Sequence, residues 1–262
     1  MKTKKDRRII QKIISAFITV VCLAVFIYAA HGLIDTFIQY KKNDQVVKEV
    51  QEIFYQDTNR LTASADKGID SRSTVRSGFE ELLKINEDVI GWITIEDTKI
   101  DYPIMQTGNN TDYLRTSFYG DYLLAGSLFL DYRNDLTTNE ERNLIVYGHR
   151  VKDGSMFEHL THYLDEDFYQ THRTFSFDSL YEAYEAEVFA VYNTMIDFNY
   201  IETDFSSDAE YEQFLKEIQE RSIYEADIDL SAHDQIITLS TCEYTLHPDD
   251  SRLVVHAKLT KK

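Results

Sequence analysis

The stretch "IITLSTCEYTLHPDDSRLVVHAKL", residues 236–259, contains the pattern that best predicts how this chain folds. A run of strand-forming residues ends at Cys242, a polar segment follows, and a second apolar run begins just after Arg252. Because β-branched and aromatic residues favour strands, the stretch predicts two antiparallel strands joined by a loop of nine residues. Such a pair allows Cys242 and Arg252 to meet at one end of a sheet.

The residues upstream predict a mostly β protein. From position 89 onward, short runs rich in Val, Ile, Tyr, Phe and Thr are separated by turn residues. Two helical stretches interrupt them, "GSMFEHLTHYLD" and "SDAEYEQFLKEIQERS", and Ser207 or Asp208 is the expected N-cap of the second. The pattern predicts a closed, mostly antiparallel β-barrel of about eight strands with a few peripheral helices. The expected strands are 89–95, 99–106, 126–132, 143–149, 184–194, 235–242 and 252–259.

The N-terminus has the composition of a membrane anchor. Residues 1–12 hold six basic side chains and one acid, and residues 13–30 hold no charge. With residues 32–34 the apolar stretch reaches about the twenty residues that span a bilayer core. We therefore expect an uncleaved transmembrane anchor at 13–34, with the N-terminus in the cytoplasm and the remainder of the chain outside the cell.

Two other interpretations of this segment fit less well. A cleaved signal peptide normally has a shorter apolar core and a small-x-small cleavage site. Here the bulky Tyr28 occupies the third position before a cut after Ala30. A buried core helix would leave the basic cluster without a purpose.

The charge is distributed unevenly along the chain. The formal net charge of the 262 residues is −18, and residues 1–12 contribute +5, so the remainder carries −23. An exported part this acidic would repel phosphates, which argues against nucleic-acid binding. We interpret the acidic surface as a solvated one and assign it no function.

Residues 35–85 are polar and helix-prone, and we expect a helical stalk with a flexible break around 62–77, where Ser, Thr, Asp and Gly accumulate. The sequence "FEELLKIN" at 79–86 predicts a short helix that leads into the globular part. The expected divisions of the chain are a cytoplasmic basic segment at 1–12, an anchor at 13–34, the stalk at 35–85 and a β-barrel domain at 86–262.

The chain has two cysteines, Cys22 in the apolar segment and Cys242 far downstream. These positions are too far apart to pair, so the exported part has no disulfide in a location where disulfides persist. A lone exported thiol is a liability unless it is buried or used. If it is used as a nucleophile, it needs a base or a cation nearby.

Two histidines are candidates for that base. His149 ends the strand "NLIVYGH", and a side chain at a strand end is held firmly while it opens onto a cleft. His247 lies five residues after Cys242, in the polar loop. The strand-end position favours His149, and His247 stays as the alternative.

The other histidines indicate no metal site. His159 and His162 lie three residues apart on an expected helix, a spacing that can ligate a metal. However, no third ligand lies at a matching offset, and "HLTH" lacks the HExxH form. By position, His31 belongs to the membrane segment, His172 and His233 to polar connections, and His256 to a face of the last strand.

Arg252 has two interpretations. An arginine at a strand start is usually solvated or paired with a surface acid, and Asp249 and Asp250 are adjacent. Beside a thiolate, its cation could instead bind the carbonyl oxygen that becomes negative during acyl transfer.

Taken together, these residues resemble the sortases, the membrane-anchored cysteine transpeptidases of Gram-positive bacteria. The family signature TLxTC reads "TLSTC" at 238–242, its histidine closes a strand as "YGH" at 147–149, and its arginine matches Arg252. The resemblance spans about 86–260, and the order of His, Cys and Arg agrees. The stretches "DVIGWITIEDTKIDYPIMQ" and "GSLFLDYRND", and the helix before the Cys strand, look most like class B.

The resemblance implies a transpeptidation on secreted proteins that bear C-terminal sorting signals. Cys242 would attack a Thr carbonyl of the signal, and an amine of a peptidoglycan precursor or cross-bridge would resolve the acyl-enzyme. His149 would be the general acid and then the base, and Arg252 would hold the substrate and its oxyanion. Ser240 and Thr241 are the expected substrate contacts, with the helix at 207–221 as a wall of the groove. The resemblance requires no cofactor and no metal.

Three alternatives remain. The first is a pilus-type or other-class sortase; the pilus-type class C enzymes usually carry an Asp-Pro-aromatic lid, and this sequence has none. A papain-like hydrolase places its Cys early, often at a helix start, with the His downstream. A non-enzymatic, membrane-anchored surface protein would keep Cys242 merely buried, and Cys242→Ala would then have no effect.

Overall fold

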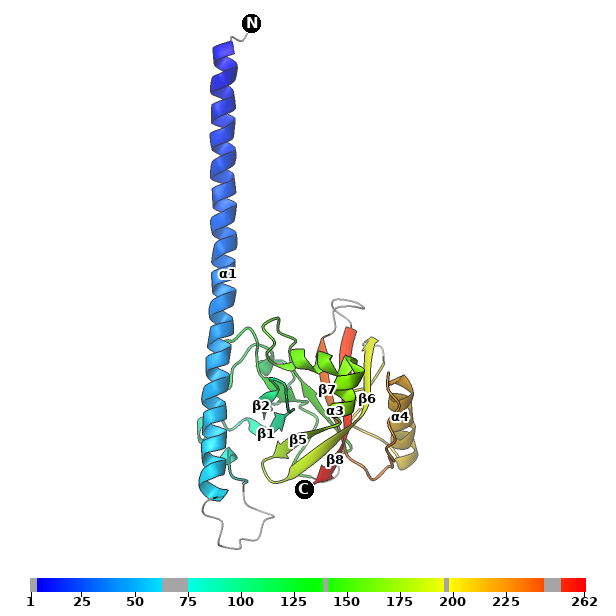
Figure 1. The fold of residues 1–262 in the computed structure, drawn as a ribbon. Helices are drawn as coiled ribbons and strands as arrows, with labels where there is room; N and C mark the ends of the chain where they lie inside the picture. Colours follow the sequence, from blue (N-terminus) through cyan, green and yellow to red (C-terminus); the bar gives the residue numbers. More distant parts are fainter. Residues whose placement is uncertain (1–3, 63–74, 139–140, 196–197, 243–250) are drawn as a thin grey trace. The chain divides into compact units, whose positions relative to one another are not determined.

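The computed structural model describes residues 4–62, 75–138, 141–195, 198–242 and 251–262. The chain forms two compact units, Met1–Lys42 and Asn43–Lys262. The first unit belongs to helix α1 (Lys4–Thr62), which continues into the second unit (Figure 1). This helix contains a stretch long and apolar enough to cross a membrane. The flexible break expected around 62–77 falls largely outside the described residues.

The part of α1 that belongs to the second unit is held by aromatic stacking and by one carboxylate. The ring of Phe54 stacks on that of Trp92 with the centroids 4.1 Å apart. The carboxylate oxygen Oδ1 of Asp101 accepts hydrogen bonds from the Tyr55 hydroxyl and from the Trp92 indole N–H, each at 2.7 Å. Burial and this carboxylate together raise the pKa of Tyr55 to about 12.

Eight strands close into a barrel in the order β1-β2-β3-β4-β7-β8-β6-β5, which confirms the predicted barrel (Figure 1). The sheet is mixed, because β2 pairs with β3 and β4 with β7 in parallel. The expected barrel is mostly antiparallel, and the other six strand pairings are antiparallel. Long crossover connections separate the members of both parallel pairs, as parallel pairing requires. The strands are β1 (Val89–Thr94), β2 (Asp101–Met105), β3 (Leu128–Leu130), β4 (Asn143–Tyr147), β5 (Thr174–Ser179), β6 (Ala183–Met195), β7 (Ile236–Cys242) and β8 (Ser251–Lys261).

One strand was missing from the expected set. Strand β5 has the sequence "TFSFDS", in which buried and more exposed residues alternate. It pairs with both β1 and β6, and so completes the barrel. The alternation is a strand signal that the sequence offered.

The helices lie between strands or at the edge of the barrel. The stretch expected to be helical at 154–165 is a 3-10 helix followed by the short α3, and Ser207 is confirmed as the N-cap of α4 because its side chain accepts the Glu210 N–H. Helix α4 lies between β6 and β7 in the chain and packs beside β6 (Figure 1). The helices of the second unit after α1 are α2 (Phe79–Ile85), η1 (Asp112–Leu114), η2 (Phe157–Leu164), α3 (Glu166–Thr171) and α4 (Asp208–Arg221).

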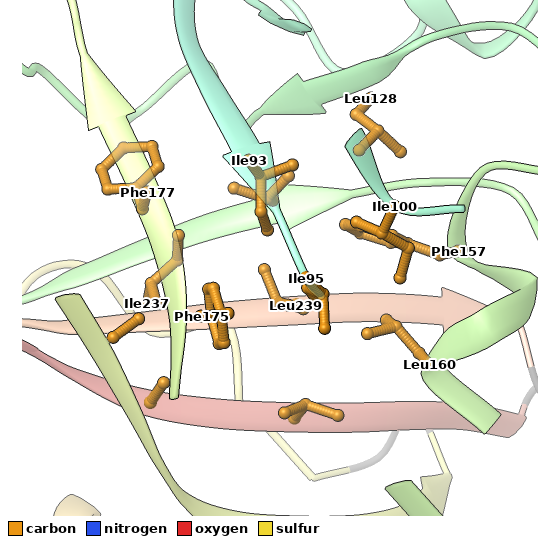
Figure 2. Close-up of a cluster of buried hydrophobic side chains, with 14 of the residues drawn as sticks. Ile93, Ile95, Ile100, Leu128, Phe157, Leu160, Phe175, Phe177, Ile237 and Leu239 are labelled. Carbon is orange, nitrogen blue, oxygen red and sulfur yellow. The ribbon is translucent and has the colours of Figure 1, made fainter. Parts of the chain in front are cut away.

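Alternation along β7 separates two clusters of buried side chains. Ile237 and Leu239 point into the barrel, where they pack with residues such as Phe175 and Ile93 (Figure 2). Ile236, on the opposite face, belongs to a second cluster between the sheet and α4. The face of β7 that carries Thr238 and Ser240 is therefore the outer face of the barrel.

Candidate active site

The backbone register between β7 and β8 places Cys242 opposite Arg252. The prediction that these strands bring the two residues to one end of the sheet is confirmed for the backbone. The side chain of Cys242 and residues 243–250 lie outside the described residues. That segment includes His247, the alternative base, and both carboxylates considered as partners of Arg252.

Strand β4 runs parallel to β7 and leads to His149. Tyr147 pairs with Ser240, and the Gly148 N–H donates to the Ser240 carbonyl at 3.2 Å. The ladder between the two strands therefore extends one residue beyond Tyr147. His149 follows directly, at the same end of the barrel as Cys242.

Only glycine fits at position 148. A Cβ there would lie 2.3 Å from Cδ2 of Leu128 and 2.7 Å from Cδ2 of Phe157. Real Cβ atoms do not approach other carbon atoms this closely, because the interior is already packed at van der Waals contact. The glycine of "YGH" thus allows the end of β4 to pack closely against β3 and η2. The backbone that carries the histidine is therefore tightly packed.

The His149 ring is half-buried and its tautomer follows from its partner. Its Nε2 lies 2.9 Å from the Leu114 carbonyl oxygen, and a carbonyl only accepts, so Nε2 carries a proton. In the neutral ring Nδ1 is then the nitrogen that can take up a proton. Burial lowers the pKa of His149, and the charge of Arg115 lowers it further, while the bond to Leu114 partly offsets both.

The backbone of His149 is held as well. Its carbonyl accepts the Phe157 N–H at 2.9 Å, which closes the loop between β4 and η2. Within that loop the guanidinium of Arg150 pairs with the carboxylate of Glu158 at 2.8 Å. The loop that carries His149 is therefore fastened to η2 at two points.

A cavity of about 280 Å³ brings the predicted residues together. It contains His149 and Arg252, which are 103 positions apart in the chain, and both expected substrate contacts, Ser240 and Thr241. The sequence offered no signal for several other lining residues, because they come from loops and strands elsewhere in the chain. The described lining residues are Asn110, Leu114, Phe129, Tyr147, Gly148, His149, Ser240, Thr241 and Arg252.

The wall of the groove differs from the expectation. Among the described residues that line the cavity, none belongs to α4, which was expected to form a wall. The segment before α4 reaches the site instead, because the Tyr200 hydroxyl lies 2.9 Å from the Ser240 hydroxyl. Ser240 and Thr241 are both buried, and no hydrogen-bond partner of the Thr241 hydroxyl is found among the described residues.

A buried carboxylate holds two of the side chains that line the cavity. Asp131 accepts two hydrogen bonds from the guanidinium of Arg133, at 2.8 and 2.9 Å. Its Oδ2 also accepts from the Tyr147 hydroxyl at 2.8 Å and from the Asn110 amide at 3.0 Å. Burial alone would raise the pKa of Asp131, but these hydrogen bonds outweigh it and lower the pKa. Two lining side chains are thus fixed by one charged pair.

The remaining histidines outside the masked segments do not reach the cavity. His159 and His162 stack on one another with their centroids 4.5 Å apart, and His256 is fully buried between hydroxyl groups. Within the described ranges, no group of three or more His, Cys, Asp or Glu side chains is placed to hold a metal ion. The lining residues carry no donor set that implies a cofactor.

Comparison with known proteins gives one consistent result. The family model described as "Sortase domain" matches residues 93–260. Sortase B of Listeria monocytogenes is 38% identical over 255 residues, which cover 97% of this chain and 99% of that protein. The structure of sortase B from Bacillus anthracis in complex with AAEK1 is 47% identical with a TM-score of 0.75, covering 86% of this chain and 100% of that one. A Staphylococcus aureus sortase B–substrate complex is 37% identical with a TM-score of 0.75, covering 86% and 99%.

Proposed function

The chain belongs to the sortase family of cysteine transpeptidases, with class B sortases as relatives along nearly its full length, and on this premise we propose its substrates and the roles of its site residues. The substrates are secreted proteins with a C-terminal sorting signal. The acceptor is an amine of a peptidoglycan precursor or cross-bridge. The observation that carries the proposal is the backbone pairing of Cys242 with Arg252, beside a cavity that contains His149.

The first step is attack by the Cys242 thiolate on the carbonyl carbon of a threonine in the sorting signal. A carbon–sulfur bond forms, the peptide bond after the threonine breaks, and the downstream segment leaves as an amine. In the second step the acceptor amine attacks the thioester, and the thiol is released. The products are a new amide bond and the free enzyme.

His149 moves the protons in both steps. Its pKa is lowered, so the ring is largely neutral at pH 7 and Nδ1 can accept the thiol proton. The same proton then passes to the leaving amine. In the second step Nδ1 takes a proton from the incoming amine and gives it to the departing Cys242 sulfur, which restores the thiol. The hydrogen bond from Nε2 to Leu114 keeps the ring in the required tautomer throughout.

Arg252 stabilises the negative charge that develops on the threonine carbonyl oxygen. Arg252 lines the cavity and its backbone lies opposite Cys242. A planar cation with several N–H donors is suited to hold both the oxyanion and the substrate backbone. Ser240 and Thr241 lie next to the nucleophile in the chain and line the same cavity, which supports their assignment as substrate contacts.

The apolar part of α1 supports the proposal of a membrane anchor at 13–34. The basic segment at 1–12 then lies in the cytoplasm, and the catalytic domain at 86–262 lies on the outer side. Protease added to intact cells should digest that domain and spare the N-terminal segment. Protection of the barrel under these conditions would contradict the orientation.

The enzymatic proposal is tested with the full-length chain in detergent. Quenched fluorescent peptides of the Asn-Pro-x-Thr type are added, with and without an amine nucleophile, and cleavage and transfer are measured. Cys242→Ala and His149→Ala should each abolish cleavage, whereas His233→Ala, at an exposed histidine away from the cavity, should not. Cleavage that persists in Cys242→Ala or His149→Ala would refute the mechanism.

A further inference from the structure

A row of four buried polar side chains crosses the outer face of the barrel below the cavity. It runs from β4 through β7 and β8 to β6, and its members are Asn143, Thr238, His256 and Tyr192. Each is at most 2% exposed. The row lies four positions before Cys242 along β7, and the proposed chemistry does not use it.

The hydrogen bonds in this row have a defined direction. The Asn143 amide nitrogen donates to backbone carbonyls, so its Oδ1 is the atom that faces Thr238, and the Thr238 hydroxyl must donate to it at 2.6 Å. The Thr238 oxygen then accepts from Nδ1 of His256 at 2.8 Å. That leaves Nε2 of His256 to accept the Tyr192 hydroxyl proton at 2.7 Å. Each of these four polar groups is therefore paired.

The row ends on the segment Tyr200–Glu202, which precedes α4. The Asn143 amide donates to the carbonyl of Tyr200 at 3.3 Å and to that of Glu202 at 2.9 Å. Arg133 donates to the carbonyl of Ile201 at 2.9 Å. Three successive carbonyls of this segment are thus held by side chains of the barrel, and the Tyr200 hydroxyl meets Ser240 in the cavity wall.

We propose that Asn143 is a positioning residue for the substrate groove. The Thr238 hydroxyl orients the Asn143 amide, and the amide fixes the segment 200–202 so that Tyr200 stays against Ser240. This rests on the proposed function for its effect on catalysis. A fully paired polar row adds little stability over an apolar one of the same shape, but it fixes the direction of the Asn143 amide. Valine has the same shape as threonine and also favours strands, so the hydroxyl is the only feature of Thr238 that valine would not supply.

The test compares Thr238→Val with Thr238→Ser in the full-length chain in detergent. Valine keeps the shape and removes the hydroxyl, whereas serine keeps the hydroxyl. In Thr238→Val, amide hydrogen exchange in 198–206 should accelerate at least about tenfold, and KM for an Asn-Pro-x-Thr peptide should rise several-fold. The kcat and the rate of Cys242 alkylation by iodoacetamide, read by mass spectrometry to separate it from Cys22, should change less than twofold. Thr238→Ser should restore the exchange rate and KM to the values of the unmodified chain and leave kcat and the alkylation rate unchanged.

Three results would overturn the proposal. One is unchanged exchange in 198–206 and unchanged KM in Thr238→Val. Another is an equal effect of valine and serine, which would assign the role to packing. The third is a fall of kcat alone together with a lower Tm, which would indicate a merely structural role. The exchange comparison needs no substrate. It therefore tests whether the Thr238 hydroxyl fixes the segment 200–202 even if no peptide is cleaved and the proposed function fails.

A second variant covers the case in which Thr238→Val does not fold. Tyr200→Phe removes only the hydroxyl that meets Ser240. It should raise KM several-fold with less than a twofold change of kcat, while the exchange of 198–206 stays as in the unmodified chain. An unchanged KM in this variant would also contradict the proposal.

Discussion

Acidification should destabilise the barrel through His256. The ring is fully buried and its nitrogens bond only to hydroxyls, so burial lowers its pKa from 6.5 to about 3. The folded state therefore holds a neutral ring at a pH where the unfolded chain binds a proton. The stabilisation from the neutral ring is fully present above pH 6.5 and is lost as the pH falls toward 3.

The size of the effect follows from the same two values. Each pKa unit corresponds to about 1.4 kcal/mol, so the free energy of unfolding should fall by about 2 kcal/mol between pH 7 and pH 5 on account of His256. The full difference, reached near pH 3, is about 5 kcal/mol. These amounts are a substantial part of the roughly 5–15 kcal/mol that stabilises an ordinary domain.

The assay is urea unfolding at pH 7, 6 and 5. Trp92 is the one tryptophan in the sequence and is buried against Phe54, so its fluorescence reports the unfolding of the barrel. The control is His256→Asn, whose amide can donate to Thr238 but does not titrate. His149 and His159 also have lowered pKa values and act in the same direction, but they do so equally in both proteins.

The prediction concerns the difference between the two proteins. The unmodified chain should lose about 2 kcal/mol more than His256→Asn between pH 7 and pH 5. If the two free energies of unfolding fall in parallel, His256 is not the buried neutral group that the structure shows, and the reasoning is refuted.

Three further predictions follow from single contacts. Gly148→Ala should cost about 1–3 kcal/mol of stability and lower kcat/KM, because its Cβ would lie 2.3 Å from a Leu128 carbon; an unchanged Tm would contradict this packing. Arg252→Lys should reduce kcat/KM about 100-fold, because lysine lacks the planar fork, and near-normal turnover would remove Arg252 from the site. Ser207→Ala should cost about 1 kcal/mol in urea unfolding, because the Glu210 N–H loses its cap; equal stability would argue against the cap.

Local patterns were sufficient for seven of the eight strands and for the choice of a candidate nucleophile. The strand-forming residues in "IITLSTC" and "RLVVHAKL" predicted β7 and β8, and their pairing places Cys242 opposite Arg252. The Ser207 N-cap and the barrel were predicted in the same way, from residues close together in the chain. The strand β5 was missed, although its alternation was visible in the sequence.

The base was chosen from sequence on weaker grounds. The strand end favoured His149 over His247, and the resemblance to sortases strengthened that choice. The hydrogen bond from Nε2 to Leu114, which decides the tautomer, joins residues 35 positions apart, and no local pattern contains it.

The sequence by itself determined most of the strands, the candidate catalytic residues and the family to which the chain is similar, because these depend on side-chain type and short spacing. Only the tertiary structure decided that β4 lies parallel to β7, that Asp131 holds Tyr147, and that Asn143 meets Thr238 from 95 positions away. The physical reason is that closure of the barrel pairs strands that are distant in the chain. Which strands become neighbours depends on packing over the whole sheet. A polar row such as that of Asn143 and Thr238 exists only once those strands have met.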